Sequence, residues 1–184
     1  MIILPQTSEI LLSGTGGQGL ILAGQILAEA VVRDGKNTVQ TQSYGPEARG
    51  GASRTEIIIS DDEIDYPRVT KPDVLLVMSQ EALNRFAGML DEKGILIIDS
   101  TYIQDIPATA ARIYKVPYSK IAKETLGKEM VANIVALGAL AAISGVVTKE
   151  SLMFALLSRI PLGTEALNQK ALELGWKSAC QAAA

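Results

Sequence analysis

The chain has 184 residues, with 17 Lys and Arg against 20 Asp and Glu, and therefore a formal charge of −3. It contains no His and one Cys, Cys180, which excludes a His-based catalytic triad, a Cys-ligated iron–sulfur cluster and an internal disulfide. Hydrophobic residues make up 48% of the chain, as in ordinary folded domains. We expect a single domain over residues 1–184.

The charge pattern gives no argument for nucleic-acid binding, because scattered charges on a mildly acidic chain form no basic patch. The first ten residues carry Glu9 and no basic segment, so we expect no signal peptide. The apolar stretch 130–147 is near the lower length limit for a membrane span, but it is rich in Ala and Gly and contains Asn133 and Ser144. We therefore expect a buried or interface helix there, no membrane contact, and a cytoplasmic location.

Strand-like and helix-like segments alternate along the first two thirds of the chain, and helical patterns dominate the last third. This order predicts an α/β fold, a Rossmann-like three-layer sandwich with a mostly parallel, mixed sheet and a helical C-terminal part. We expect strands at 9–13, 38–42, 54–60, 74–78, 94–99 and 113–116, and helices at 20–33, 80–90, 119–126, 129–144, 149–159 and 164–179.

The connection between the second and third strands sets the direction of the third. It spans residues 43–53 and contains Pro46 and three glycines. A crossover between parallel strands normally needs a dozen or more residues, usually with a helix. We therefore expect the third strand to return antiparallel beside the second, which makes the sheet mixed.

A glycine-rich loop connects the first strand to the first helix and fits the pattern G-x-G-x-x-G. The candidate ligand-binding residues in it are Gly14, Thr15, Gly16, Gly17, Gln18 and Gly19. Glycines allow a tight turn and a close approach of a ligand to the main chain, and the unpaired amides at the helix start favour an anion. The pattern therefore indicates a phosphate or pyrophosphate site.

Two other interpretations of this loop stay open. The glycines could serve only the close packing of strand against helix. Alternatively the loop could bind NAD or FAD, but that fingerprint includes an acidic residue at the end of the second strand. Residues 39–43 read VQTQS and contain no acid, which argues against a nicotinamide or flavin site.

A second loop, residues 43–54, holds three glycines and two arginines within twelve residues. If the first two strands are parallel neighbours, both loops leave the same edge of the sheet, where such folds bind ligands. Arginine would supply charge to an anion or to a carboxylate of a partner, although a simple surface turn with solvated arginines is the alternative. The candidate residues here are Tyr44, Gly45, Arg49, Gly50, Gly51 and Arg54.

Other polar residues favour structural roles. Asp99, Ser100 and Thr101 follow a strand and could contact a ligand, but Ser and Thr at such a position more often cap the next element. Asn133 stands among small side chains in the Ala-rich segment and is a candidate for a hydrogen bond at an interface. Cys180 has no basic or His neighbour that would activate it as a nucleophile. We therefore expect no catalytic residue and no metal site on this chain.

Four segments together resemble the gamma subunits of 2-oxoacid:ferredoxin oxidoreductases. They are GTGGQGLILAG at 14–24, QTQSYGPEARGGASR at 40–54, IDYP at 64–67 and KPD at 71–73. The segment QSYGPEARGG is most similar to the gamma subunit of 2-oxoglutarate:ferredoxin oxidoreductase. The resemblance covers residues 8–175, and the long second motif makes it specific.

The resemblance implies a multi-subunit enzyme that decarboxylates a 2-oxoacid oxidatively with coenzyme A, giving an acyl-CoA, CO2 and reduced ferredoxin. It implies alpha and beta partner subunits, with a ferredoxin-like delta subunit as a further candidate, and ferredoxin as the electron acceptor. Thiamine diphosphate, Mg2+ and the iron–sulfur clusters would belong to those other subunits. This chain would be non-catalytic alone and would help to bind coenzyme A, with both glycine-rich loops as candidate contacts, and to assemble the complex.

Two other functions remain as alternatives: a stand-alone NAD(P)- or flavin-binding protein, and a structural adaptor whose loops contact only partner subunits. A subunit made for a larger complex should also expose an apolar patch of more than a few hundred Å2. We therefore expect the isolated chain to self-associate.

Overall fold

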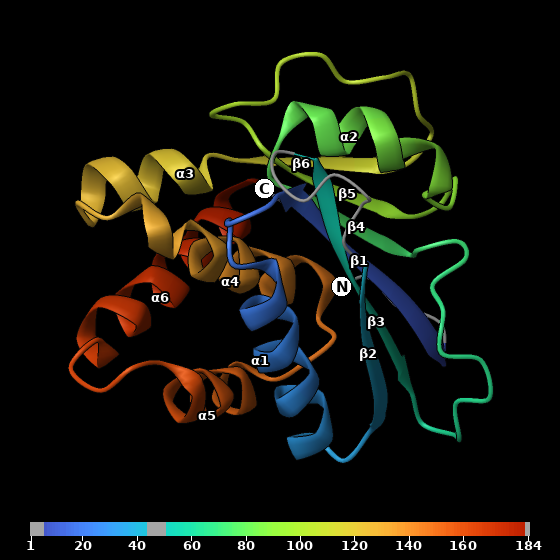
Figure 1. Cartoon of the computed structure of the whole chain (residues 1–184), viewed down its shortest axis with the longest axis horizontal. Coiled ribbons are helices and arrows are strands. Elements are labelled where there is room, and N and C mark those ends of the chain that lie inside the picture. Colours follow the sequence, from blue (N-terminus) through green and yellow to red (C-terminus); the bar gives the residue numbers. More distant parts are fainter. Residues whose placement is uncertain (1–5, 44–50, 183–184) are drawn as a thin grey trace.

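The computed structural model describes residues 6–43 and 51–182. A six-stranded sheet runs through the molecule in the order β2-β3-β1-β4-β5-β6 (Figure 1). Its strands are β1 (Thr7–Thr15), β2 (Asn37–Ser43), β3 (Ala52–Ser60), β4 (Val74–Val77), β5 (Ile95–Asp99) and β6 (Arg112–Val116).

The sheet is mixed, as expected. β1, β4, β5 and β6 form parallel pairs, whereas β3 runs antiparallel to both β1 and β2. The antiparallel return of β3 is therefore confirmed. The premise that β1 and β2 are neighbours is wrong, because β3 lies between them. Even so, Arg54 pairs with Ser43 on one side and with Ser13 on the other, so β1 and β2 end at the same edge of the sheet.

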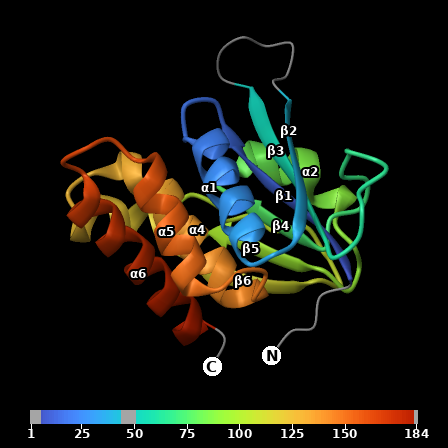
Figure 2. The ribbon, with the colours of Figure 1, turned by 90° about the horizontal axis from the view of Figure 1, so that it is seen from below.

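Helices cover the two faces of the sheet unequally. α1 (Leu20–Arg33), α4 (Ala132–Ser144), α5 (Lys149–Arg159) and α6 (Glu165–Ala182) lie on one face (Figures 1 and 2). The other face carries the short α2 (Gln80–Phe86) and the 3-10 turn η1 (Ala87–Met89). Alternate residues of β1 and β3 accordingly enter two hydrophobic cores, with Ile10 and Ile57 in the larger one and Leu11 and Ile58 in the smaller one.

Two predicted helices are less regular than the sequence pattern indicates. Residues 119–126 form a short α3 (Tyr118–Lys120) followed by a π-turn, η2 (Ile121–Thr125). The Ala-rich segment begins with a 3-10 turn, η3 (Glu129–Val131), before α4. Within the described residues, none of the helices combines the length and the apolar character that a membrane span needs.

The apolar helix α4 is buried almost along its whole length because α6 packs tightly across it. A Cβ atom on Gly138 would collide with the main-chain carbonyl of Leu172, and one on Gly175 with the carbonyl of Val135. The small side chains of this segment therefore serve close packing inside the chain, which is one of the two uses that the sequence leaves open.

Candidate functional site

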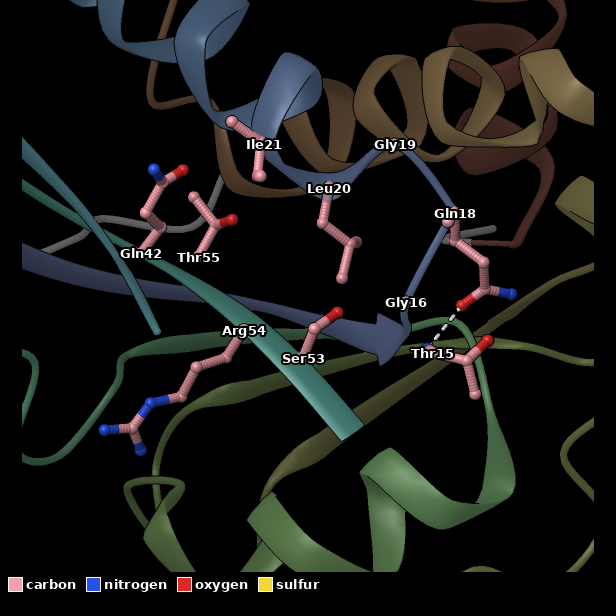
Figure 3. Close-up of a pocket in the computed structure, with 11 residues that line it drawn as sticks. Thr15, Gly16, Gln18, Gly19, Leu20, Ile21, Gln42, Ser53, Arg54 and Thr55 are labelled. Carbon is pink, nitrogen blue, oxygen red and sulfur yellow. Dashed lines mark hydrogen bonds between the residues drawn. The ribbon is translucent and has the colours of Figure 1, made fainter. Parts of the chain in front are cut away.

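The glycine-rich loop turns the chain from the end of β1 into α1 (Figure 3). Gly17 and Gly19 have φ angles of +94° and +73°, a conformation that other residues adopt at a cost. Gly14 is crowded, because a Cβ atom there would lie 3.1 Å from Cβ of Met78 and would collide with the side chain of Gln18. Three of the four glycines are thus explained by the fold itself.

Gly16 has no such explanation. Its φ angle is not positive, and nothing lies within 4 Å of the position that a Cβ atom would occupy. Neither backbone conformation nor internal packing requires a glycine here. A side chain at this position would instead project into the open space above the loop, where a ligand would need to approach the main chain.

Gln18 braces the loop from inside. Its Oε1 accepts a hydrogen bond from the amide of Thr15 at 2.8 Å (Figure 3), and its Nε2 donates to the carbonyl of Met78 at 3.3 Å. Both ends of the side-chain amide are therefore engaged within the protein. In this structure Gln18 fixes the shape of the loop against the end of β4.

The N-terminus of α1 has the properties of an anion site. Gly19 is its N-cap and offers no side chain to cap the helix, and the first turn contains no acidic residue. By contrast, Ser79 caps α2 and Thr148 caps α5 through their hydroxyl groups. The first amides of α1 and the positive end of its dipole therefore face a space that a negatively charged group can occupy.

A cavity of about 280 Å3 opens between the start of α1 and the ends of β2 and β3. The glycine loop and the first turn of α1 form one wall, and polar side chains of the two strands form the other (Figure 3). It is lined by Thr15, Gly16, Gly17, Gln18, Gly19, Leu20, Ile21, Gln42, Ser53, Arg54 and Thr55. Gln42 stands near the position where dinucleotide-binding folds carry an acidic residue.

Tyr118 closes the neighbouring part of the same sheet edge. Its side chain is fully buried, and its hydroxyl donates to the carbonyl of Val77 at 2.7 Å. Burial, and next the charge of Asp99, raise the pKa of Tyr118 above its ordinary value, so the phenol stays protonated and remains a donor.

Arg54 is the third residue of β3 and directs its guanidinium away from the glycine loop (Figure 3). Its Nη2 forms an ion pair with Oε1 of Glu56 at 2.9 Å, and its charge lies 5.6 Å from the ring centre of Phe86. Ser53 and Thr55, which alternate with Arg54, face α1 instead. In this structure the Arg54 side chain thus belongs to the α2 face, and its contact with a ligand stays a prediction.

Of the other candidate residues in the second loop, the structure describes one, Gly51. Gly51 directly precedes β3 and is half-buried. Four predicted site residues lie outside the described residues: Tyr44, Gly45, Arg49 and Gly50. Their ligand contacts stay predictions.

Glu56 is a buried carboxylate that the sequence analysis did not single out. Only 2% of its surface is exposed, and besides Arg54 it accepts hydrogen bonds at 3.2 Å from the hydroxyl of Thr41 and from the amide of Val69. It therefore ties β2, β3 and the segment before β4 together beneath the second loop. The sequence does carry a signal for this role, because Glu56 directly precedes three isoleucines in a segment predicted as a strand.

Two polar residues of the sequence analysis have defined structural partners. Asp99 is fully buried and accepts hydrogen bonds from the amides of Thr101 and Ser119, so its carboxylate joins the turn after β5 to the start of α3. Asn133 forms its hydrogen bond within the same chain, because its Nδ2 donates to the carbonyl of Gly19 at 3.1 Å. Its expected interface role is therefore corrected, since Asn133 holds the glycine loop of its own chain.

The described residues contain no group of three or more His, Cys, Asp or Glu placed to hold a metal ion. Cys180 is exposed on the last turns of α6. The site accordingly consists of main-chain amides, hydroxyls and side-chain amides, a set suited to binding rather than to acid–base or redox chemistry.

Comparison with known proteins identifies the family of the chain. Residues 9–178 match the family model described as pyruvate ferredoxin/flavodoxin oxidoreductase. The chain is 47% identical, over 93% of both sequences, to the 2-oxoglutarate synthase subunit KorC of Methanocaldococcus jannaschii. The subunit of the same name from Methanothermobacter thermautotrophicus is 44% identical over 91% of this chain and 92% of its own.

Solved structures extend the similarity to three dimensions. The gamma subunit of a keto/oxoacid ferredoxin oxidoreductase from Geobacter sulfurreducens superposes with a TM-score of 0.87 at 47% identity, covering 95% of this chain and 99% of that one. The fold also recurs in the 2-oxoglutarate:ferredoxin oxidoreductase of Magnetococcus marinus, with a TM-score of 0.87 at 23% identity, over 96% of this chain and 32% of that one. The chain belongs to the pyruvate ferredoxin/flavodoxin oxidoreductase family and is a relative of its gamma subunits.

Proposed function

We propose that this chain is the gamma subunit of a multi-subunit 2-oxoglutarate:ferredoxin oxidoreductase. The complex would decarboxylate 2-oxoglutarate oxidatively with coenzyme A, giving succinyl-CoA, CO2 and reduced ferredoxin. The support is the identity of 47% over 93% of both sequences with a protein named 2-oxoglutarate synthase subunit KorC. Within the complex this chain would bind coenzyme A and help to assemble the catalytic partners.

The catalytic groups would come from alpha and beta partner subunits, with a ferredoxin-like delta subunit as a further candidate. A single Cys and the absence of His do not fit an iron–sulfur cluster on this chain. Thiamine diphosphate with Mg2+ would likewise be held elsewhere, because the described residues offer no metal-ligand group. These cofactors supply the carbanion and electron-transfer chemistry when bound to the partners.

The openness of Gly16 carries the coenzyme A part of the proposal. At Gly14, Gly17 and Gly19 the fold alone accounts for glycine, whereas the main chain at Gly16 is open to the approach of a ligand, which supports a contact there. A phosphate of coenzyme A would accept hydrogen bonds from the amides of the loop and the first turn of α1, with Thr15 at its edge. Gln18 would hold the loop in this shape, and the carbonyl of Gly19 is fixed by Asn133.

The second loop would complete the site from the opposite side. Tyr44, Gly45, Arg49, Gly50 and Gly51 are proposed to frame the entrance, with Arg49 supplying positive charge. Arg54 is proposed to act there only by fixing the start of β3, because Glu56 engages its guanidinium.

The test uses the chain assembled with its alpha and beta partners. Gly16→Ala should raise the Michaelis constant for coenzyme A about tenfold and leave the constant for 2-oxoglutarate unchanged. Its unfolding free energy should stay within about 1 kcal/mol of wild type, because the position tolerates a Cβ atom. Gly88→Ala is the matched control, since Gly88 is also open, has no positive φ and lies in η1.

Four results would contradict the proposal. Ferredoxin reduction with 2-oxoglutarate by the isolated chain would overturn its role as a non-catalytic subunit. An unchanged coenzyme A constant in Gly16→Ala, together with weaker assembly of an Arg49→Ala variant, would favour the adaptor function. Tight binding of NADH or FAD by the chain, without binding of coenzyme A, would favour a stand-alone dinucleotide-binding protein. Faster turnover with pyruvate than with 2-oxoglutarate would overturn the substrate assignment.

A further inference from the structure

Thr55 carries a buried hydroxyl that the fold does not use. The residue lies on β3, facing α1, and only 1% of its surface is exposed. Among the described residues, its Oγ1 has no hydrogen-bond partner. Burying an unpaired hydroxyl destabilises a fold, whereas a valine would fill nearly the same volume without this cost.

The orientation of Thr55 is fixed by its methyl group. Cγ2 packs so closely against α1 that a Cβ atom on Gly24 would collide with it. A β-branched side chain has few alternative rotamers, so the hydroxyl is held on the other side, toward the space between β3 and the first turn of α1 (Figure 3). Thr55 also lines the cavity that contains the glycine loop.

Nearby hydroxyl groups show how such side chains are ordinarily satisfied in this sheet. Thr38 on β2 donates to the carbonyl of Ile58 at 2.8 Å, and Thr41 donates to Glu56 at 3.2 Å. Ser53, two residues before Thr55 and on the same face, donates to the carbonyl of Gly14 at 3.4 Å. Thr55 differs from all three, although it stands on the wall of the proposed ligand site.

We propose that Thr55 is a ligand contact, whose hydroxyl donates a hydrogen bond to an oxygen of the nucleotide half of coenzyme A. This inference rests on the proposed function. The first turn of α1, with Leu20 and Ile21, and the strand wall, with Ser53 and Thr55, line the same cavity. A molecule whose phosphate lies at the helix amides therefore places its next oxygen atoms, those of the phosphate or the attached ribose, beside Thr55.

The experiment compares Thr55→Val and Thr55→Ser in the assembled complex. Thr55→Val should raise the Michaelis constant for coenzyme A about three- to tenfold, the range expected for one lost hydrogen bond. The inhibition constant of adenosine 3′,5′-bisphosphate, which is the nucleotide half alone, should rise by a similar factor. Thr55→Ser keeps the hydroxyl but loses the methyl group that orients it, so it should recover part of the loss seen in Thr55→Val in both measurements.

Stability measurements separate a ligand contact from a structural role. Urea unfolding of Thr55→Val should show no loss of stability, because the variant removes a hydroxyl without a partner. Thr38→Val is the matched control: it removes a hydroxyl with a partner, so it should destabilise the chain and leave the coenzyme A constant unchanged.

Each outcome bears on the inference. If Gly16→Ala weakens coenzyme A binding and Thr55→Val does not, the inference about Thr55 is overturned and the proposed function stands. If neither variant changes the constant, both are overturned. If Thr55→Val raises the coenzyme A constant but leaves adenosine 3′,5′-bisphosphate inhibition unchanged, the contact is not with the nucleotide half and the inference fails.

Discussion

The side-chain amide of Asn133 on α4 donates a hydrogen bond of 3.1 Å to the main-chain carbonyl of Gly19, 114 residues earlier in the chain. Only 4% of Asn133 is exposed, and its Oδ1 accepts a hydrogen bond from the amide of Ile134 at 3.0 Å. The helical C-terminal part of the chain therefore reaches the residue at which α1 begins. The shape of the glycine loop depends on an element that the loop motif itself does not contain.

Replacing Asn133 with Ala should destabilise the chain by about 0.5–1.5 kcal/mol, because the Gly19 carbonyl loses this hydrogen bond and keeps the one from the amide of Ala23. Hydrogen exchange of the amides of residues 16–20 should become faster. Asn168→Ala is the matched control, since Asn168 is also buried and donates to the carbonyl of Thr164 at 2.9 Å. That variant should lose similar stability in urea unfolding without a change in loop exchange. Equal exchange in both variants would contradict the role of Asn133.

Removing Arg54 should leave Glu56 as a buried charge without its cation. Arg54→Ala is expected to cost about 3–5 kcal/mol in the free energy of unfolding at pH 7. Adding Glu56→Gln should recover part of this loss, because the amide is neutral and can still accept the hydrogen bonds of Thr41 and Val69. Urea unfolding of the two single variants and the double variant gives the coupling free energy between Arg54 and Glu56. Purely additive losses would show that the two side chains do not stabilise each other.

Gly175 on α6 should not tolerate even the smallest side chain. Its Cβ atom would meet the carbonyl of Val135, a main-chain atom that moves only if the helices separate. Gly175→Ala should therefore lower the unfolding free energy by about 1–3 kcal/mol, despite the better helix propensity of Ala. Thermal or urea unfolding measures it, with the open Gly88→Ala variant as the control. A stabilised Gly175→Ala chain would refute the close crossing of α4 and α6.

Asp34 should make stability depend on acidic pH. Its carboxylate accepts hydrogen bonds from the amide and hydroxyl of Thr148, at 2.6 and 2.8 Å, and from the hydroxyl of Ser151 at 2.5 Å. Burial of Asp34 acts to raise its pKa, but these hydrogen bonds outweigh it and hold the pKa below its ordinary value. A lowered folded pKa means that the stabilisation is present above the unfolded value and disappears as the pH falls through the folded value.

Asp34→Asn should therefore destabilise the chain by about 1–2 kcal/mol at pH 7, and the difference from wild type should shrink below about pH 4. Urea unfolding at a series of pH values measures both effects. Asp61→Asn is the control, because Asp61 forms an exposed ion pair with Lys36 and should contribute little. A difference between Asp34→Asn and wild type that stays constant down to pH 3 would contradict the assignment.

Local patterns predicted the elements of this fold well, because they are encoded in neighbouring residues. The helix at 20–33 has the bounds of α1, since Gly19 and Gly35 flank an apolar segment, and α5 has the bounds expected for 149–159. The antiparallel β3 followed from the length of one connection. Strand order could not be predicted in this way, because the choice of β3 rather than β2 as the neighbour of β1 depends on pairing between distant segments.

The candidate site shows the same division. The glycine motif and its place between a strand and a helix could be recognised locally. The partners of Asn133 and Glu56 could not, nor could the place of Thr55 in the cavity wall, because each depends on elements that are far apart in the sequence. The direction of the Arg54 side chain could not be predicted from the sequence either, since it depends on which face of β3 packs on α2.

The insertion of β3 between β1 and β2 also sets the distance between the strand ends from which the two loops start. Adjacent strands are about 4.8 Å apart, so the ends of β1 and β2 are separated by roughly 10 Å across the sheet. Inorganic phosphate is too small to bridge that separation, whereas an elongated molecule such as coenzyme A is long enough. Orthophosphate should therefore compete poorly with coenzyme A, even though both carry the group that the helix end attracts.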